Sequence, residues 1–487
     1  AGFLMLAAMF LYHVVWRLIQ KFWLCGQPET VWMALRFPSP LQTDGIPYLL
    51  NKNFMMHRHL ILPTLLAGTL LTVSAAVEGK VDKSSLRCWE KGETPAVTVT
   101  VTNPDGTAAD ATVTLSLQTD AYQPVGEQSK SVTVAPGDSA RVVFDNLSLS
   151  PGFYRATVKI GERSLDTFNL GYDPTSIVSP VDRQPDFEEF WKEALGELAA
   201  VAPEYKLTRD PYRSSGNKNV YLVEMKSLPD STGGEPVVIR GFYSEPVAPG
   251  KYPALITYQG YDGGTSQIYY GNPDDKPGWI EFYLSTRGQL LDNRDGKNHY
   301  GDYFAWNFGD KDKYYYRGAF MDVVRAIDFI TSREKTDTTR VYAQGQSQGG
   351  AFTVASAALG GGRIKAIAPA ITFLGDYPDY FRVAHWPAEV AFRCQKEKEL
   401  TDEEMYRFLS YFDSKNLAPW VKCPVLATFG LQDPVCPPHT NFASYNLFDT
   451  SEKSYIIMPE NGHWVTPDWY GRFMDFFYSV MPPQAND

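Results

Sequence analysis

A serine flanked by two glycines has the clearest chemical meaning in this chain. The pattern Gly345-Gln346-Ser347-Gln348-Gly349 lies between residues 340–344, which we expect to form a strand, and residues 349–359, which we expect to form a helix. In that position, G-x-S-x-G is typical of a sharp turn that presents a nucleophilic serine, because glycines permit the strained turn and close packing of the helix. We therefore predict that Ser347 attacks an acyl group.

A serine hydroxyl becomes an effective nucleophile only when a base removes its proton, and a histidine often takes that role. In proteins with this turn, the order along the chain is serine, acid, histidine. His463 follows a strand expected at residues 454–458. His439 follows two prolines at the expected start of a helix, where we interpret it as a capping or surface residue. We predict that His463 is the base.

The third member is an acid that holds the histidine in one orientation and one tautomer. Asp433 lies in the loop after a strand expected at residues 425–429, and it precedes His463. Asp376 and Asp379 follow the preceding strand and are the reserve candidates. Each of these aspartates could instead be a helix cap or a turn residue. We predict that Asp433 is the acid.

Acyl transfer also requires N–H donors for the negative oxygen that develops in the transition state. The backbone amide of Gln348, directly after the serine, is expected to supply one of them. The second is expected from the loop after the strand at residues 254–258, which reads Gln259-Gly260-Tyr261-Asp262-Gly263-Gly264. The glycines of this loop would let backbone amides approach a ligand, although they also suit an ordinary turn.

Two patterns of hydrophobicity indicate the elements that position these residues. Between residues 77 and 175, short stretches of alternating polar and apolar residues are separated by turn residues, which predicts a small β-sandwich domain. From residue 176 to 487, strand-like segments alternate with amphipathic helical ones, which predicts a mostly parallel sheet with helices on both faces. The expected fold class is therefore α/β, preceded by a small all-β sandwich domain.

The first 76 residues look like targeting and upstream sequence. Residues 55–76 combine a short basic stretch, an apolar run of about fourteen residues and small residues, which are the parts of a secretory signal peptide. A membrane anchor is the alternative, but the run falls short of the roughly 20 residues that span a bilayer. We expect residues 1–54 to be a non-native or upstream segment. The mature chain is expected to have no stable membrane span and to be secreted or periplasmic.

Composition excludes several classes of partner. The 487 residues carry 45 basic and 56 acidic side chains, and the net charge of −11 has the wrong sign for a nucleic-acid partner. The five cysteines are far apart, which excludes a zinc ribbon or a disulfide miniprotein but leaves a Cys423–Cys436 pair open. No histidine and carboxylate cluster has the spacing of metal ligands, so we expect no metal and no organic cofactor.

Three motifs together resemble one known family. They are Arg287-Gly288-Gln289, the G-x-S-Q-G around Ser347, and Tyr314-Tyr315-Tyr316-Arg317-Gly318-Ala319 followed by Asp322 and Arg325. In these motifs and their joint spacing, residues 180–480 resemble the acetylxylan esterase and cephalosporin C deacetylase family, carbohydrate esterase family seven, which has the α/β-hydrolase fold.

The resemblance implies specific roles and a substrate. It implies that Ser347, Asp433 and His463 form a catalytic triad. It also implies that the oxyanion-hole amides are those of Tyr261 and Gln348, and that Arg287 and Gln289 are structural supports near the site. Two neighbours depart from the family, since Gln259 and Trp464 stand where it usually has a histidine and a glutamate. Known members are often hexameric, so the implied partners are an acetylated carbohydrate substrate and further copies of the chain; the added β-domain would alter that assembly.

Three functions are compatible with this sequence. The leading hypothesis is a serine esterase that removes acetyl groups from xylan, xylo-oligosaccharides or related sugars. A second is a general short-chain carboxylesterase or a peptidase, because a fold does not fix a substrate. A third is a carbohydrate-binding protein whose hydrolase domain is catalytically silent. The complete set of serine, acid and histidine favours an active enzyme.

Overall fold

The computed structural model describes residues 77–83, 88–145, 147–230, 234–261, 276–293 and 299–482. These residues all belong to one compact unit, which spans residues 72–487. The segment 1–54 and the expected signal peptide at 55–76 lie outside the described residues.

The N-terminal β-region consists of two antiparallel sheets apart from one short parallel pair, and alternating apolar side chains form its core. Its strands are β1 (Glu78–Val81), β2 (Cys88–Trp89), β3 (Val97–Thr102), β4 (Ala109–Thr119), β5 (Pro124–Val134), β6 (Ser139–Phe144), β7 (Gly152–Ile160) and β8 (Arg163–Tyr172). They are ordered β2-β8-β7-β4-β5 in one sheet and β1-β3-β6 in the other. Val99 and Val101 of β3 share one core with Val113 and Leu115 of β4. We call residues 77–172 the sandwich.

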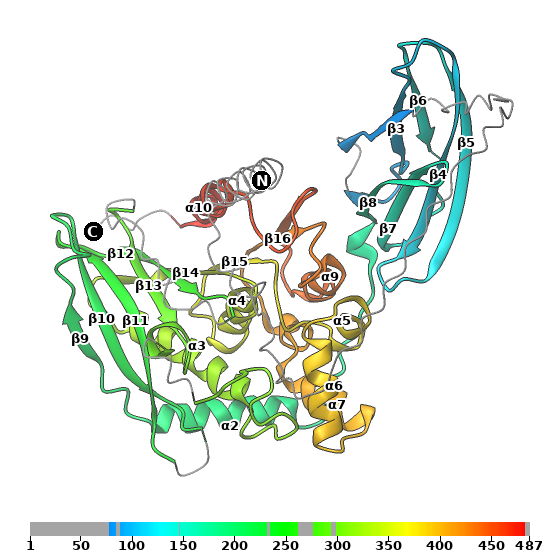
Figure 1. Ribbon diagram of the computed structural model, residues 1–487. Coiled ribbons are helices and arrows are strands. Elements are labelled where there is room, and N and C mark those ends of the chain that lie inside the picture. The colour runs from blue at the N-terminus through cyan, green and yellow to red at the C-terminus, as the bar shows by residue number, and fades with distance from the viewer. Residues whose placement is uncertain are drawn as a thin grey trace, which may run out of the picture. The chain divides into compact units, whose positions relative to one another are not determined.

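The rest of the described chain is built on one mixed sheet, shown with its flanking helices in Figure 1. Its strands are β9 (Lys206–Arg209), β10 (Lys218–Ser227), β11 (Val237–Pro246), β12 (Tyr252–Tyr258), β13 (Ile280–Ser285), β14 (Thr336–Gln346), β15 (Ala366–Ala370), β16 (Val425–Gly430) and β17 (Lys453–Met458). The order is β17-β16-β15-β14-β12-β13-β11-β10-β9. Strands β12 to β17 pair in parallel, whereas β9, β10 and β11 form an antiparallel extension.

Helices cover both faces of the parallel part of this sheet, which agrees with the nearly continuous burial of strands such as β15 and β16. They are α2 (Phe187–Ala200), α3 (Tyr315–Thr331), α4 (Gln348–Leu359), α5 (Tyr377–Val383), α6 (Ala388–Glu397), α7 (Asp402–Leu409), α8 (Ser414–Leu417), α9 (Pro438–Leu447) and α10 (Trp469–Val480). Val341 and Ala343 of β14 pack in the core that contains α3 and α4. Tyr342, between them, packs instead against Phe477 of α10. The α/β-hydrolase prediction, with a preceding β-rich region, is confirmed.

This topology brings the predicted site residues to one edge of the sheet. Strands β14, β16 and β17 run in parallel, so their carboxyl ends lie at the same edge. Ser347 directly follows β14, and Asp433 and His463 follow β16 and β17.

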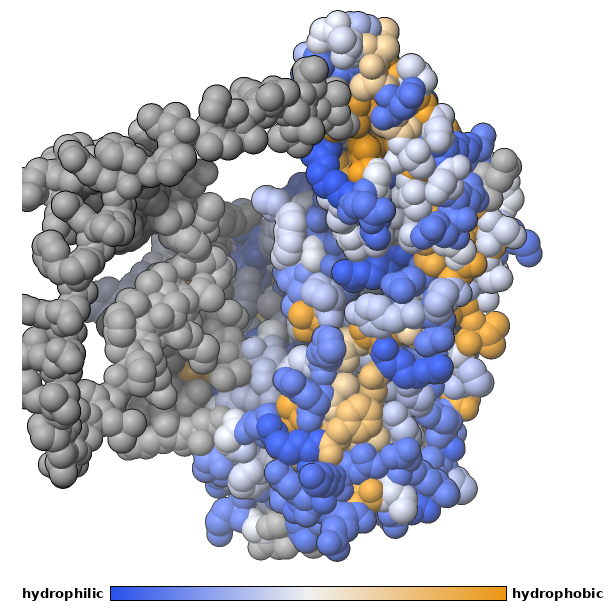
Figure 2. Space-filling model, turned by 45° about the vertical axis from the view of Figure 1, so that its right-hand side comes forward, coloured by the Kyte–Doolittle hydropathy of each residue, from blue (hydrophilic) through white to orange (hydrophobic). Residues whose placement is uncertain are grey.

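The surface outside this edge mixes polar and apolar side chains. On the face shown in Figure 2, apolar residues form small separate patches among hydrophilic ones. Among the described residues, no helix combines the length and the apolar character that crossing a membrane requires.

Candidate active site

Ser347 lies in a strained turn that its neighbouring glycines make possible. Its backbone has φ of 57° and ψ of −121°, a conformation that residues other than glycine rarely adopt. A Cβ atom on Gly345 would lie 2.4 Å from the carbonyl oxygen of Gly349. A Cβ atom on Gly349 would lie 2.3 Å from the carbonyl oxygen of Tyr258. Both glycines are therefore needed for α4 to begin directly against the sheet.

The structure places the three predicted triad residues in one hydrogen-bonded chain. His463 Nε2 lies 3.0 Å from Ser347 Oγ, and His463 Nδ1 lies 2.8 Å from Asp433 Oδ2. With Nδ1 protonated and bonded to the carboxylate, Nε2 presents its lone pair to the serine hydroxyl. This arrangement can accept the serine proton during attack on an acyl carbon.

The Asp433 carboxylate is buried and fixed by its own loop. Its second oxygen, Oδ1, accepts hydrogen bonds from the backbone N–H groups of Val435 at 2.8 Å and Cys436 at 2.9 Å. The side chain has no exposed surface. Because both oxygens are bonded, the carboxylate has one orientation, which directs Oδ2 at the histidine.

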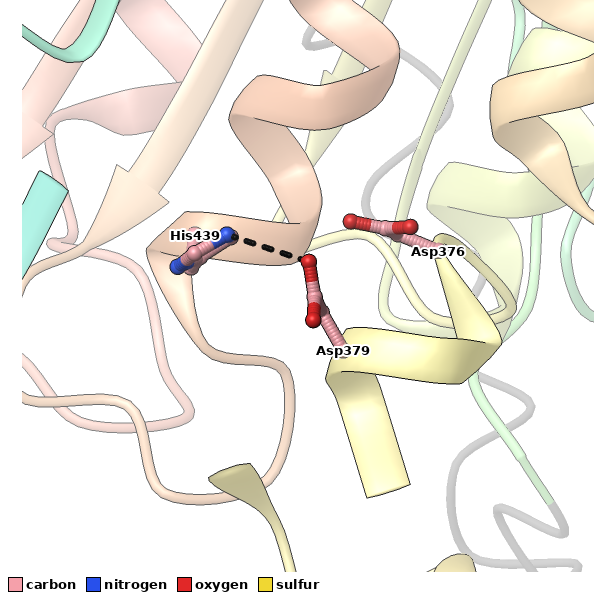
Figure 3. A group of neighbouring side chains, drawn as sticks. All are labelled: Asp376, Asp379 and His439. Atoms are coloured by element: carbon pink, nitrogen blue, oxygen red, sulfur yellow. Dashed lines mark ion pairs between the residues drawn. The ribbon is translucent and has the colours of Figure 1, made fainter. Parts of the chain in front are cut away.

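The reserve acids, Asp376 and Asp379, have other partners. Asp376 Oδ1 accepts from Lys415 Nζ at 3.0 Å and from Ser179 at 2.8 Å. Asp379 Oδ2 lies 3.6 Å from His439 Nε2, the ion pair drawn in Figure 3. Neither aspartate contacts His463 within the part of the chain that the structure describes.

His439 is not the capping or surface residue that we expected. Its Nδ1 lies 2.7 Å from Asp120 Oδ2 of the sandwich, while its other nitrogen faces Asp379. Burial lowers the pKa of His439, but the hydrogen bonds to the two carboxylates outweigh that effect and raise it to about 10. His439 is therefore a cation at neutral pH and joins a sandwich carboxylate to one of α5. The prediction failed because residue 120 is more than 300 positions away in the sequence.

One histidine and two carboxylates, those of His439, Asp376 and Asp379, could also act as metal ligands. Their donor atoms lie within 4.8 Å of one another. In the structure, Lys415 pairs with Asp376 and His439 pairs with Asp379, and Figure 3 shows the second of these ion pairs.

A cavity of about 530 Å³ opens beside the serine. It is lined by Gly260, Tyr261, Ser347, Trp386, Val435 and His463, among others. The backbone N–H groups of Tyr261 and Gln348 have no hydrogen-bond partner among the described residues. These two amides could therefore donate to the oxygen of a bound acyl group, in the oxyanion-hole role that we expected.

The Gln348 side chain is held by a chain of amides. Gln348 and Gln289 exchange two hydrogen bonds of 3.1 Å, and Tyr316 donates to Gln348 Oε1 at 3.0 Å. Gln289 Oε1 in turn accepts from Gln259 Nε2 at 3.2 Å. Gln259, one of the departures from the family pattern, thus supports the residue after the nucleophile. Trp464, the other departure, is 52% exposed.

Arg287 is a buried support and does not line this cavity. Its guanidinium makes two hydrogen bonds to Asp322, of 3.0 and 2.6 Å. Burial alone would lower the pKa of Arg287, but the adjacent Asp322 carboxylate raises it. A Cβ atom on Gly318 would lie 2.1 Å from this guanidinium, which explains the glycine in the tyrosine-rich motif. Two of the motifs therefore meet behind the site.

The described cysteines and His299 are not members of the hydrogen-bonded chain of Ser347, His463 and Asp433. Cys88, Cys394, Cys423 and Cys436 are free thiols, so Cys423 and Cys436 are not paired. His299 lies 3.6 Å from Asp230 and its side chain is 62% exposed. Sequence reasoning missed Trp386 and Val435 as lining residues of the cavity, because nothing in their local sequence distinguishes them from core residues.

The sheet topology and the strained serine turn define the class of protein: the described chain has an α/β-hydrolase fold. Residues 171–479 match the family model of acetyl xylan esterase (AXE1), so the chain belongs to that family. Members of this family are carboxylic-ester hydrolases, which is the activity class that we expected. The match begins at the last strand of the sandwich, β8.

Three similar proteins share about a quarter of their aligned residues with this chain. The chain is 27% identical over 357 residues to the acetyl esterase Axe7A of Xylanibacter ruminicola, which covers 70% of this chain and 76% of that protein. Acetyl xylan esterase 1 from Thermoanaerobacterium sp. JW/SL YS485 superimposes with a TM-score of 0.56 and 26% identity. An acetyl xylan esterase from Paenibacillus sp. R4 gives 0.55 and 27%. Both structures match over 98% of their own length but 63% of this chain, so part of this chain has no counterpart in them.

Proposed function

We propose that this protein is a serine esterase that removes acetyl groups from acetylated sugars such as xylan or xylo-oligosaccharides. The observation that carries the proposal is the continuous path from Asp433 Oδ2 through His463 to Ser347 Oγ, with bonds of 2.8 and 3.0 Å. Membership of the acetyl xylan esterase family supports the acetyl group as the acyl part.

In the first half-reaction, Ser347 Oγ forms a bond to the acetyl carbonyl carbon as its proton passes to His463 Nε2. The backbone amides of Tyr261 and Gln348 donate to the resulting oxyanion. When the tetrahedral intermediate collapses, the bond to the sugar oxygen breaks, and His463 protonates that oxygen. The products of this step are the free sugar hydroxyl and acetyl-Ser347.

In the second half-reaction, water replaces the sugar. His463 removes a proton from a water molecule as the water oxygen attacks the carbonyl carbon of acetyl-Ser347. His463 then returns a proton to Ser347 Oγ as acetate leaves. Asp433 keeps its negative charge throughout and stabilises the imidazolium that forms in each step. No metal or organic cofactor takes part in this mechanism.

A labelling experiment tests the nucleophile. A fluorophosphonate should modify the wild-type enzyme once, and peptide mass spectrometry should place the label on the peptide that contains Ser347. Labelling of another residue, or equal labelling of a Ser347→Ala variant, would contradict the proposal.

A series of acyl esters with one leaving group tests the acetyl specificity. We expect kcat/KM to fall steeply from acetate to propionate, butyrate and octanoate, because membership of the acetyl xylan esterase family implies an acetyl-sized subsite that would exclude longer chains by steric clash. If butyrate or octanoate equals acetate, a general carboxylesterase replaces the deacetylase.

We further propose that the protein is secreted or periplasmic. The composition of residues 55–76 supports this location. N-terminal sequencing of the protein recovered from the medium or periplasm should begin near residue 77, and full-length protein retained in the cytoplasm would refute the proposal.

A further inference from the structure

A second cavity lies between the sandwich and the hydrolase region. Its volume is about 570 Å³, within the range of roughly 300 to 1,000 Å³ that is usual for small-molecule sites. The sandwich contributes Tyr122, Arg155 and Phe168, and the hydrolase region contributes His385, Trp386 and Pro434. Neither half of the chain could form this cavity by itself.

This second cavity adjoins the catalytic one. Trp386 and Val435 line both cavities, and Asp433 lies on the wall of the second. A substrate whose acetyl group lies at Ser347 could therefore extend its leaving group past Trp386 toward the sandwich.

Tyr122 is held in an unusual conformation at the mouth of this cavity. It lies in the turn between β4 and β5 with φ of +63°, which is rare for a bulky side chain, and its side chain is 48% exposed. Strained residues persist where the surrounding structure fixes them and are concentrated at binding sites. The turn is fixed by hydrogen bonds such as that from Tyr122 N to Thr119 O, of 2.9 Å.

Arg155 places a guanidinium group with N–H donors next to this ring. Its guanidinium lies over the Tyr122 ring, 5.9 Å from the centroid. Its N–H donors make no hydrogen bond or ion pair with the residues that the structure describes. The two acidic side chains of the cavity are already engaged, Asp120 by His439 and Asp433 by His463. Arg155 is therefore the charged group with donors available to a ligand.

The sandwich wall is also fixed relative to the catalytic loop. The Gln432 side chain accepts from Asn169 N at 2.7 Å and donates to Asn169 O at 3.0 Å, and Asn169 Nδ2 donates to Leu431 O at 3.2 Å. Phe153 of β7 packs on Phe442 of α9, with ring centroids 5.7 Å apart. These contacts keep the cavity formed without a ligand.

We propose that this second cavity is a leaving-group subsite that binds the sugar chain of an acetylated oligosaccharide. This inference rests on the proposed function. The C–H face of a sugar ring would lie on the electron-rich face of Tyr122, and Arg155 would donate to sugar hydroxyls. The sandwich thus makes the enzyme select an oligosaccharide over an acetylated monosaccharide.

Steady-state kinetics on two substrates test this subsite. For Tyr122→Ala and for Arg155→Ala, kcat/KM on an acetylated xylotetraose should fall about three- to tenfold, mainly through KM. Activity on 4-nitrophenyl acetate, which is too short to reach the sandwich, should stay within twofold. Arg141→Ala, which changes an exposed arginine of β6 outside the cavity, should leave both substrates unaffected. Tyr122→Phe should retain wild-type selectivity.

Besides unchanged kinetics in the Tyr122 and Arg155 variants, two results of these assays would overturn the subsite without touching the proposed function. One is an equal loss on both substrates, which would indicate a structural role for Tyr122 and Arg155. The other is a wild-type enzyme that hydrolyses acetylated xylose as efficiently as the tetrasaccharide.

Calorimetric titration of a Ser347→Ala variant with unacetylated xylotetraose gives a readout that is independent of turnover. Binding that weakens in the Tyr122→Ala background supports the subsite, and absence of binding refutes it. An enzyme that binds the tetrasaccharide but hydrolyses no ester would instead refute the proposed function.

Discussion

Ser347 and Asp433, the proposed nucleophile and the proposed acid, are positioned by different sets of contacts. Ser347 is held within the hydrolase region, since its N–H donates to Ala370 O of β15 and its carbonyl accepts from Phe373 N, both at 3.0 Å. The loop that carries Asp433 is bonded both to the loop after β17, where Gln432 N donates to Asn461 O at 2.8 Å, and to the sandwich, through Gln432 and Asn169. The two ends of one catalytic chain therefore depend on different contacts.

Among the described residues, the hydrolase region alone supplies the contacts that position Ser347, whereas the sandwich supplies part of the contacts that position the Asp433 loop. The turn around Ser347 depends on two glycines that let it pack against β12 and the start of α4, all within the hydrolase region. The Asp433 loop is held by its own backbone amides and, in addition, by contacts with Asn169, more than 250 positions away in the sequence. Changes at the sandwich contact should accordingly act on the acid and histidine, and leave the serine turn intact.

The largest effect is expected from loss of the nucleophile. Ser347→Ala should lower kcat roughly a millionfold, as loss of the serine does in other triads. The melting temperature should stay near that of the wild type, because only one oxygen is removed. Residual activity above about 1% of wild type, measured on 4-nitrophenyl acetate, would identify another nucleophile.

Replacement of the acid should have the second largest effect. Asp433→Asn should lower kcat about ten-thousandfold, because the histidine would lose the anion that sets its tautomer. The matched control is Asp379→Asn, which removes a carboxylate that pairs with His439, and it should change kcat by less than about threefold. A larger loss in the Asp379 variant than in the Asp433 variant would move the acid to α5.

Breaking the contact between the sandwich and the acid loop should have a moderate effect. Gln432→Ala removes the paired hydrogen bonds to Asn169 and the hydrogen bond that Gln432 Nε2 donates to Pro459 O at 2.8 Å, each worth about 1 kcal/mol of stability. Because the loosened loop would orient Asp433 less well, we expect kcat to fall about three- to tenfold. Fluorophosphonate labelling should still reach Ser347. Glu460→Gln, at an exposed residue of the next loop, serves as the control and should leave kcat unchanged. A wild-type kcat in Gln432→Ala would show that the hydrolase region orders the loop alone.

The His439 ion pairs should make stability depend on pH. The folded-state pKa of about 10 lies above the unfolded value of about 6.5. The stabilisation is therefore complete below about pH 6.5, decreases as the pH rises, and is lost above about pH 10. The melting temperature of the wild type should exceed that of His439→Gln at pH 6 and approach it at pH 10. The exposed His299→Gln is the control, and a difference that grows with pH would contradict the assignment.

The smallest effect is expected from relief of strain at the nucleophile. Ser347→Gly should raise the melting temperature by a few degrees relative to Ser347→Ala, because glycine adopts the positive φ without a Cβ penalty. Thermal unfolding of the two variants, followed by circular dichroism, measures the difference. Equal melting temperatures would mean that the turn stores little strain.

Several elements were predictable from sequence because their signals are local. Period-two alternation predicted strands at residues 96–101 and 140–144, which correspond to β3 and β6, and the apolar runs predicted the parallel strands of the hydrolase region. Helices α5 and α6 were missed, since they are short and lie among prolines and aromatic residues. The start of α9 was expected after the two prolines that precede His439, and the helix begins at Pro438. The helix expected at residues 319–333 begins four residues earlier, at Tyr315, because the tyrosine-rich motif forms its first turn.

The sequence by itself determined the family, the fold class and the serine turn. These depend on residue spacing along the chain, and a G-x-S-x-G between strand and helix has few structural solutions. Chain order also singled out Asp433 and His463, because parallel strands must bring their carboxyl ends to one edge of the sheet.

Only the tertiary structure decided what surrounds those residues. The pairing of His439 with Asp120, the contact between Gln432 and Asn169, and the cavity between Tyr122 and Trp386 all join residues far apart in the chain. Such contacts have no local signal, because each residue alone is equally suited to a turn, a surface or a core. They exist only because folding packs the sandwich against the edge of the sheet where the acid loop lies.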